Sequence, residues 1–103
     1  MTTTVSLYVE LKAKAGKEED VARFLAGARD LVAAEPGTIA WFAARFDKNT
    51  FAIFDAFNDE AGREAHLGGQ VAAALMAHAS ELLAEAPQIR EAGVLADKLP
   101  VPS

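Results

Sequence analysis

This chain of 103 residues has no cysteine, few basic side chains and no long apolar run. Without cysteine it has no disulfide, no thiolate nucleophile and no cysteine-ligated metal. Ten basic residues, scattered among fifteen acidic ones, give a formal net charge of -5, which argues against a nucleic-acid partner. No stretch approaches the roughly 20 apolar residues that span a bilayer, and the start, MTTTVSLYVELKAKAG, lacks a signal-peptide pattern. We therefore expect a cytoplasmic protein without a membrane partner.

The two histidines do not have the spacing of a metal site. His66 and His78 are twelve residues apart, whereas zinc hydrolases place two histidines on adjacent turns of one helix. We therefore expect no bound metal. His78 follows Leu75 by three residues on the apolar side of a helix, where a packed structural histidine is the commoner role.

The hydrophobic pattern predicts one domain, residues 1–103, with a true core, since 51% of the residues are hydrophobic. Strands are recognised by alternation and helices by apolar residues three and four apart. In order, the chain shows a strand, a helix ended by Pro36-Gly37, two strands joined by a polar turn, a helix interrupted at Gly68-Gly69, and a last apolar stretch: residues 4–12, 17–35, 38–46, 51–57, 59–86 and 89–99. This last stretch is either a strand containing Val94 and Leu95 or a loop or arm, which Gly93 and the alternating charges around it also suit. This order predicts an α+β, ferredoxin-like βαββαβ fold with an antiparallel sheet.

The two middle strands carry bulky apolar side chains on both faces. Trp41 and Ile53 lie on one face, while Phe42 and Phe54 lie on the other. A sheet that is covered on one side only alternates apolar with polar residues, so both faces should be covered. Because both helices pack on one face, we expect a homodimer formed by sheet-on-sheet packing across a two-fold axis.

The segment FAIFDAFNDEAGREAH, residues 51–66, is the strongest candidate for a functional site. Alternation places Asp55 on the same strand face as Phe51, Ile53 and Phe57. Asp55 is either an ordinary charge at the edge of the sheet or a buried carboxylate. A buried carboxylate needs a partner, and three side chains are candidates: His66, Arg45 and Tyr8.

His66 follows this strand by about two helical turns, after a corner that Asn58 or Asp59 can cap. Histidine is the side chain most easily tuned for proton transfer near neutral pH, and a surface or capping role is the alternative with similar support. Trp41 is either a core residue or the wall of a flat aromatic pocket.

These segments together resemble the antibiotic biosynthesis monooxygenase family of small dimeric α/β barrels. The resemblance covers nearly the whole chain and rests on a glycine before an acidic helix start, on Glu35-Pro36-Gly37-Thr38 and on the run from Phe51 to His66, with Asp55 where many members have Glu. It implies a ferredoxin-like homodimer with a pocket between the sheet and the helix of residues 59–86. It also implies oxygenation of a small phenol or quinol without flavin or metal.

The same resemblance implies roles for individual residues. His66 matches the family's histidine and would act as base or as partner of the substrate anion, with Asp55 as its orienter. The candidates for substrate binding are Trp41, Tyr8, Phe57 and Arg45. Many members carry a second histidine where this chain has Val71, and the iron ligand of the haem-degrading branch falls near Met76, so haem degradation is not expected.

Three functions are compatible with the sequence. The first is a cofactor-independent monooxygenase, the second a small-metabolite isomerase or detoxifying enzyme with the same pocket, and the third a ligand-binding dimer without catalysis. Fold alone does not choose among them. The sequence also leaves open whether residues 92–103 cross to a partner subunit.

Overall fold

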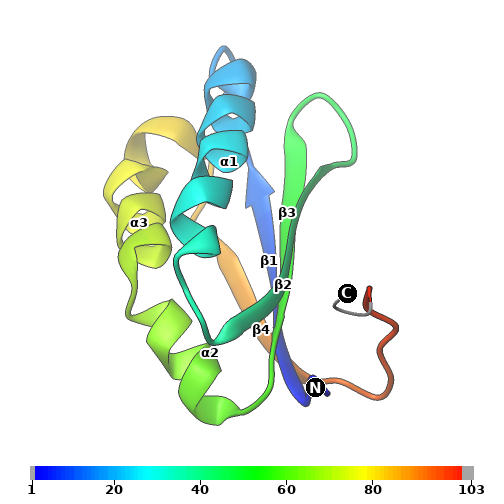
Figure 1. Ribbon diagram of the computed structural model, residues 1–103. Helices are drawn as coiled ribbons and strands as arrows, with labels where there is room; N and C mark the ends of the chain where they lie inside the picture. The colour runs from blue at the N-terminus through cyan, green and yellow to red at the C-terminus, as the bar shows by residue number, and fades with distance from the viewer. Residues whose placement is uncertain (1, 101–103) are drawn as a thin grey trace.

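The sheet has four antiparallel strands in the order β2-β3-β1-β4, and all the helices of the described chain lie on one side of it (Figure 1). This computed structural model describes residues 2–100. Its elements are β1 (Val5–Lys12), α1 (Glu18–Ala33), β2 (Thr38–Arg45), β3 (Thr50–Phe57), α2 (Glu60–Leu67), α3 (Gln70–Leu82) and β4 (Gln88–Gly93). The predicted α+β, ferredoxin-like fold is confirmed, and the expected interruption at Gly68-Gly69 separates α2 from α3.

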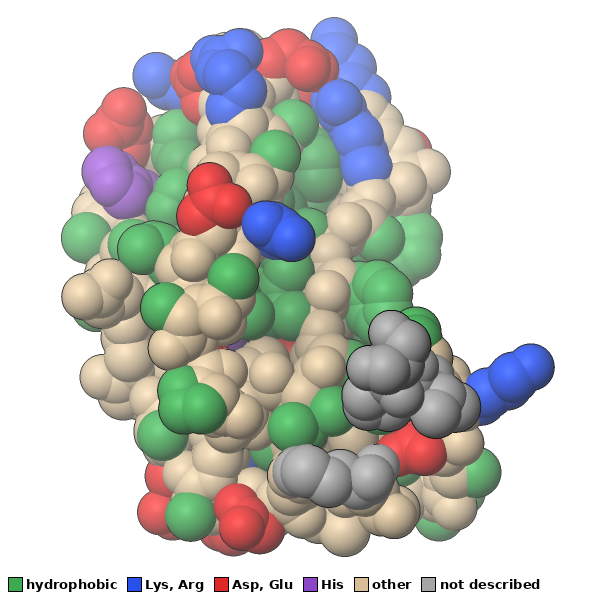
Figure 2. All heavy atoms as spheres, viewed as in Figure 1, with side chains coloured by type: hydrophobic (Ala, Val, Ile, Leu, Met, Phe, Trp, Pro, Cys, Tyr) green, Lys and Arg blue, Asp and Glu red, His purple; other side chains and the backbone are tan. Residues whose placement is uncertain are grey.

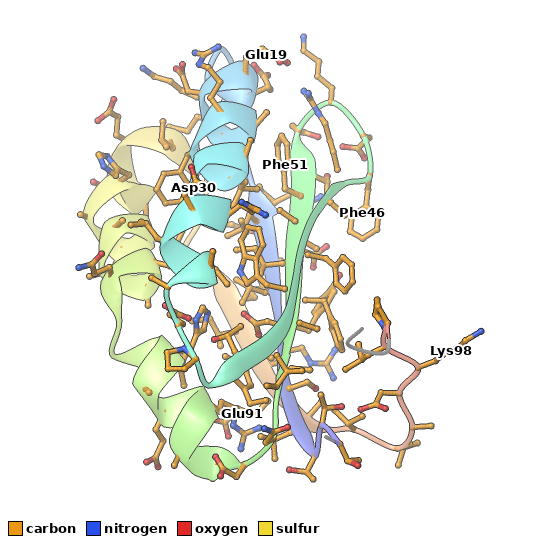
Figure 3. The ribbon with its side chains drawn as sticks, in the orientation of Figure 1. Glu19, Asp30, Phe46, Phe51, Glu91 and Lys98 are labelled. Carbon is orange, nitrogen blue, oxygen red and sulfur yellow. The ribbon has the colours of Figure 1, made fainter. Side chains whose placement is uncertain are left out.

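The strand register decides which side chains meet beneath the helices. Asp55 of β3 lies directly between Leu7 of β1 and Trp41 of β2. The predicted alternation of the large side chains of β3 is confirmed, because Ile53, Asp55 and Phe57 are buried beneath the helices while Phe54, between Ile53 and Asp55, is exposed. Figure 3 shows Phe51 pointing from β3 toward the helices and Phe46 lying on the opposite side.

The core fills the space between the helices and this inner face. Helix α1 starts with three acidic residues at the positive end of its dipole and buries a stripe at Val21, Leu25, Ala28 and Val32. Trp41 packs against two groups of buried residues, one formed by the strands with the first half of α1 and Leu75 of α3, and the other by the second half of α1 with Val71. This single indole therefore connects both parts of the core.

The outer face of the sheet is not covered by any helix of the described residues. One row across it contains Phe42, Phe54, Tyr8 and Arg90, from β2, β3, β1 and β4. Phe42 is 61% and Phe54 42% exposed. The chain after β4 passes on this side (Figure 1).

Two expectations about the C-terminal half are wrong. The last strand is Gln88–Gly93, so Val94 and Leu95 lie beyond it, and Leu95 is fully exposed. The backbone of β1, which pairs Val5 with Gly93, fixes this strand rather than the apolar residues that follow it. His78 is exposed on α3 and stands edge-on to Phe24, with 5.8 Å between ring centres, so it is not on the buried seam. Figure 2 shows a histidine side chain, in purple, on the molecular surface at the side of α3.

Candidate active site

A close contact between two glycines brings the end of α1 onto α2. A Cβ on Gly62 would lie 2.9 Å from the carbonyl oxygen of Gly37, and a Cβ on Gly37 would lie 3.0 Å from the Cα of Gly62. The two backbones touch only because neither residue has a side chain. Glu35 lies two residues before Gly37, and His66 lies one helical turn after Gly62. The glycine contact therefore holds Glu35 beside His66.

His66 is buried between two carboxylates. Its Nδ1 lies 2.6 Å from Oε1 of Glu35, and its Nε2 lies 3.0 Å from Oδ2 of Asp55. His66 is 7% and Asp55 1% exposed, whereas the side chain of Glu35 keeps 20% of its surface accessible. Both ring nitrogens are thus engaged by the protein, and Glu35 is the member of the group that reaches the surface.

Neighbouring groups hold this arrangement in place. Thr38 Oγ1 donates to the same Oε1 of Glu35 at 2.8 Å, and the ring of Phe57 packs against His66 with 5.5 Å between centres. Helix α2 begins as expected at the corner after β3, because the side chain of Asp59 accepts from the N–H of Gly62 at 2.9 Å. A capped helix start fixes the direction in which His66 projects.

The electrostatics of the group favour a charged imidazole. Burial is the largest single influence and lowers the pKa of His66, because it disfavours the charged form. The hydrogen bonds to Asp55 and Glu35 and the negative charges of both carboxylates together outweigh burial, so the pKa of His66 is raised. The two carboxylates therefore stabilise the protonated imidazolium form of His66.

Apart from Oδ2 of Asp55, which faces Nε2 of His66 at 3.0 Å, two buried polar atoms of the site have no hydrogen-bond partner among residues 2–100. They are Oδ1 of Asp55 and Nε1 of Trp41. Trp41 also forms part of the wall of a cleft of about 240 Å³ between the end of α1 and β2. The cleft is lined by Arg29, Val32, Ala33, Glu35, Thr38, Ile39 and Trp41. Glu35, whose side chain is partly accessible, lines the cleft and contacts the buried His66.

The structure brings together some of the predicted site residues and separates others. His66, Asp55, Phe57 and Trp41 all lie on the inner face of the sheet or against it. Tyr8 pairs with Phe54 in the outer row, so it does not meet His66 within this chain.

Arg45 also lies away from His66. It pairs with Glu19 at 2.9 Å and stacks over the ring of Phe51, 5.0 Å from its centre. Glu19 lies at the start of α1, at the opposite end of the molecule from α2 (Figures 1 and 3). Of the three candidate partners for Asp55, the one that contacts it is His66.

Sequence reasoning did not nominate Glu35, although it belongs to the Glu35-Pro36-Gly37-Thr38 turn. An acidic residue at the C-terminal end of a helix interacts unfavourably with the helix dipole. This unfavourable placement was the feature of the sequence that could have indicated a specific role for Glu35. Within residues 2–100, no group of three or more His, Cys, Asp or Glu side chains is arranged to hold a metal ion. No helix in the same range is long and apolar enough to cross a membrane.

The fold is that of the antibiotic biosynthesis monooxygenase-like proteins. A "putative antibiotic biosynthesis monooxygenase" from Nitrosomonas europaea shares 16% identity, with a TM-score of 0.80 over 92% of this chain and 93% of that one. PA3566 from Pseudomonas aeruginosa shares 23% identity, with a TM-score of 0.78 over 93% and 98% of the two chains. No family model and no curated protein matches the chain.

A much more similar structure is NE2512 from Nitrosomonas europaea, a protein of unknown function. It shares 54% identity and a TM-score of 0.96, with 98% of each chain covered. The chain belongs to the same family as NE2512. The family and fold are thereby fixed, while the activity has to be argued from the site.

Proposed function

We propose that this protein is a cofactor-independent oxygenase of a small aromatic, a phenol or quinol. The observation that carries the proposal is the buried histidine between two carboxylates, next to a cleft with an aromatic wall. The fold shared with proteins named "putative antibiotic biosynthesis monooxygenase" supports the same reaction class.

In the proposed reaction a base takes the hydroxyl proton, and the electron-rich anion then passes an electron to molecular oxygen. Asp55 and His66 form the base. Oδ1 of Asp55 has no partner and can take the proton, while Nε2 of His66 lies 3.0 Å from Oδ2 of the same carboxylate. His66 must be neutral to receive a proton. Because its pKa is raised, we expect activity to increase with pH, and to do so at a higher pH than that at which an ordinary histidine loses its proton. Trp41 and Phe57 contribute an apolar environment that excludes water.

Oxygen consumption tests the proposal. Chelator-treated protein is assayed with a panel of quinols and polyphenols, alongside His66→Ala and, as the matched control, His78→Ala. We expect uptake that is lost in His66→Ala and kept in His78→Ala, since His78 is exposed on α3. Absence of uptake across the panel would favour a non-oxygenase metabolite enzyme or a ligand-binding dimer. Oxygen uptake that persists in His66→Ala would show that His66 is not part of the base.

We also propose that two copies associate through the outer face of the sheet. Phe42 and Phe54 stand side by side there at 61% and 42% exposure, and such neighbouring apolar side chains mark an interaction surface. A two-fold interface uses one such face twice.

Sedimentation velocity at micromolar concentration tests this association. We expect a dimer for the natural sequence and a monomer for Phe54→Glu, because a charge at the centre of the row would be buried without a partner. Lys48→Glu, an exposed change in the turn between β2 and β3, is the control and should remain dimeric. A monomeric natural sequence would refute the association.

A further inference from the structure

Two unpartnered atoms of opposite kind lie on neighbouring residues of the site. Nε1 of Trp41 is a buried donor, and Oδ1 of Asp55 is a buried acceptor. Trp41 and Asp55 are directly opposite in the β2–β3 register, on the face beneath the helices. Side chains so placed have their Cβ atoms about 5 Å apart. Unpaired buried polar groups are rare, so two adjacent ones require an explanation.

One group that satisfies both atoms is a hydroxyl. Its hydrogen donates to the carboxylate oxygen, and its lone pair accepts from the indole N–H. A carbonyl has no hydrogen for Asp55, an ammonium has no lone pair for Trp41, and a second carboxylate would be repelled by Asp55. A water molecule has the same hydrogen-bonding capacity as an alcohol, so binding of water is the competing explanation.

The cleft indicates what carries the hydroxyl. Trp41 lines the cleft and is also the register partner of Asp55, so the two unpartnered atoms lie next to the cleft. Val32 and Ile39 add apolar wall, and the volume of about 240 Å³ is smaller than the pockets of drug-sized ligands. These dimensions fit a ligand of about one ring, and Arg29, Glu35 and Thr38 add polar groups to the wall.

We propose that Trp41 Nε1 and Asp55 Oδ1 form a hydroxyl-recognition pair that holds the phenolic O–H of a one-ring ligand entering from the cleft beside Glu35. This inference rests on the proposed function for the ligand class. It assigns Trp41 a hydrogen bond to the ligand oxygen in addition to its packing role, and it assigns Asp55 the direct contact with the ligand hydrogen.

The indole N–H provides a direct measurement, because Trp41 is the only tryptophan of the chain. Its ¹⁵N–¹H signal is followed while the protein, under argon, is titrated with phenol, anisole or toluene. Phenol can donate and accept, anisole can only accept, and toluene can do neither. We expect phenol to shift the indole signal strongly and to bind about 10-fold more tightly than toluene, since two hydrogen bonds are gained. Anisole should shift the signal but bind less tightly than phenol.

Variants separate the two contacts. Asp55→Asn should reduce the affinity for phenol about 3- to 10-fold and leave toluene nearly unchanged, and Trp41→Phe, measured through backbone signals, should do the same. Glu10→Gln is the matched control, because Glu10 lies in the strand beside β3 and belongs to the outer face. It should leave both affinities unchanged. If one variant does not fold by circular dichroism, the other variant and the three ligands with the natural sequence decide the outcome.

Two results would overturn the inference: equal affinities for phenol and toluene, as expected if water already satisfies both atoms, or an indole signal that responds to all three ligands alike. The experiment is independent of turnover because oxygen is excluded. Preference for phenol without oxygen uptake would support the recognition pair and refute the oxygenase. Oxygen uptake without a preference for phenol would support the oxygenase and refute the recognition pair.

Discussion

The contact between Gly37 and Gly62 makes a prediction that opposes helix propensity. Gly62 and Gly27 both lie in helices, and alanine at such positions usually stabilises a protein by about 0.5–1 kcal/mol. A Cβ on Gly27 would have open space within 4 Å. A Cβ on Gly62 would lie 2.9 Å from the carbonyl oxygen of Gly37 and 3.5 Å from the Cβ of Phe57, so the turn has to move.

Gly27→Ala should therefore raise the free energy of unfolding, whereas Gly62→Ala should lower it. Overpacking costs about 1–3 kcal/mol, which exceeds the propensity gain, so the two variants should differ by about 1–3 kcal/mol. For a domain of this size each kcal/mol corresponds to a change of about 4–8 °C in Tm. Urea denaturation followed by circular dichroism measures both variants.

The same variants give a second readout at the site. In Gly62→Ala the displaced turn should move Glu35 away from His66 and lower the pKa of His66, which NMR titration measures. Gly27→Ala should leave this pKa as in the natural sequence. The reasoning would be refuted if Gly62→Ala stabilised the fold as much as Gly27→Ala and left the pKa of His66 unchanged.

Three further predictions concern the same group of residues. Because the pKa of His66 is raised on folding, its contacts stabilise the fold fully below the unfolded-state pKa of about 6.5, and this contribution is lost as pH rises through the folded-state pKa. Urea midpoints should fall over that range and fall less in His66→Gln; equal slopes would contradict the assignment. Glu35→Gln should lower the pKa of His66 in an NMR titration, since one negative neighbour is removed, and an unchanged pKa would show that Glu35 does not hold the proton. Asp59→Ala should cost about 0.5–2 kcal/mol in urea denaturation, because the N–H of Gly62 loses its acceptor; an unchanged midpoint would show that the cap is dispensable.

The parts of the fold that depend on local pattern could be predicted from the sequence. Alternation alone placed Asp55 and Phe54 on opposite faces of the strand, since side-chain direction in a strand has a period of two, and in the structure Asp55 is buried while Phe54 is exposed. The helix stripe through Val21, Leu25 and Ala28 followed in the same way from its spacing.

The parts that depend on distant pairing could not be predicted in this way. All residues of β4 are exposed, so the strand has no hydrophobic pattern, and its pairing with β1 sets its limits. Glu35 reaches His66 across 31 positions of the chain, through a glycine contact that no local pattern records. Arg45 was a reasonable partner for Asp55 by charge, but α1 supplies Glu19 closer to it.

The alternation along β3 limits where insertions and deletions can be tolerated in the chain. Phe54 and Asp55 are adjacent codons, yet one side chain faces outward and the other faces the buried histidine. Inserting or deleting a single residue within Thr50–Phe57 would exchange their directions and damage both faces at once. Residues 46–49, between β2 and β3, are all exposed, and length changes there would leave both faces intact. In this family, length variation should therefore accumulate at that turn and be purged from the strand.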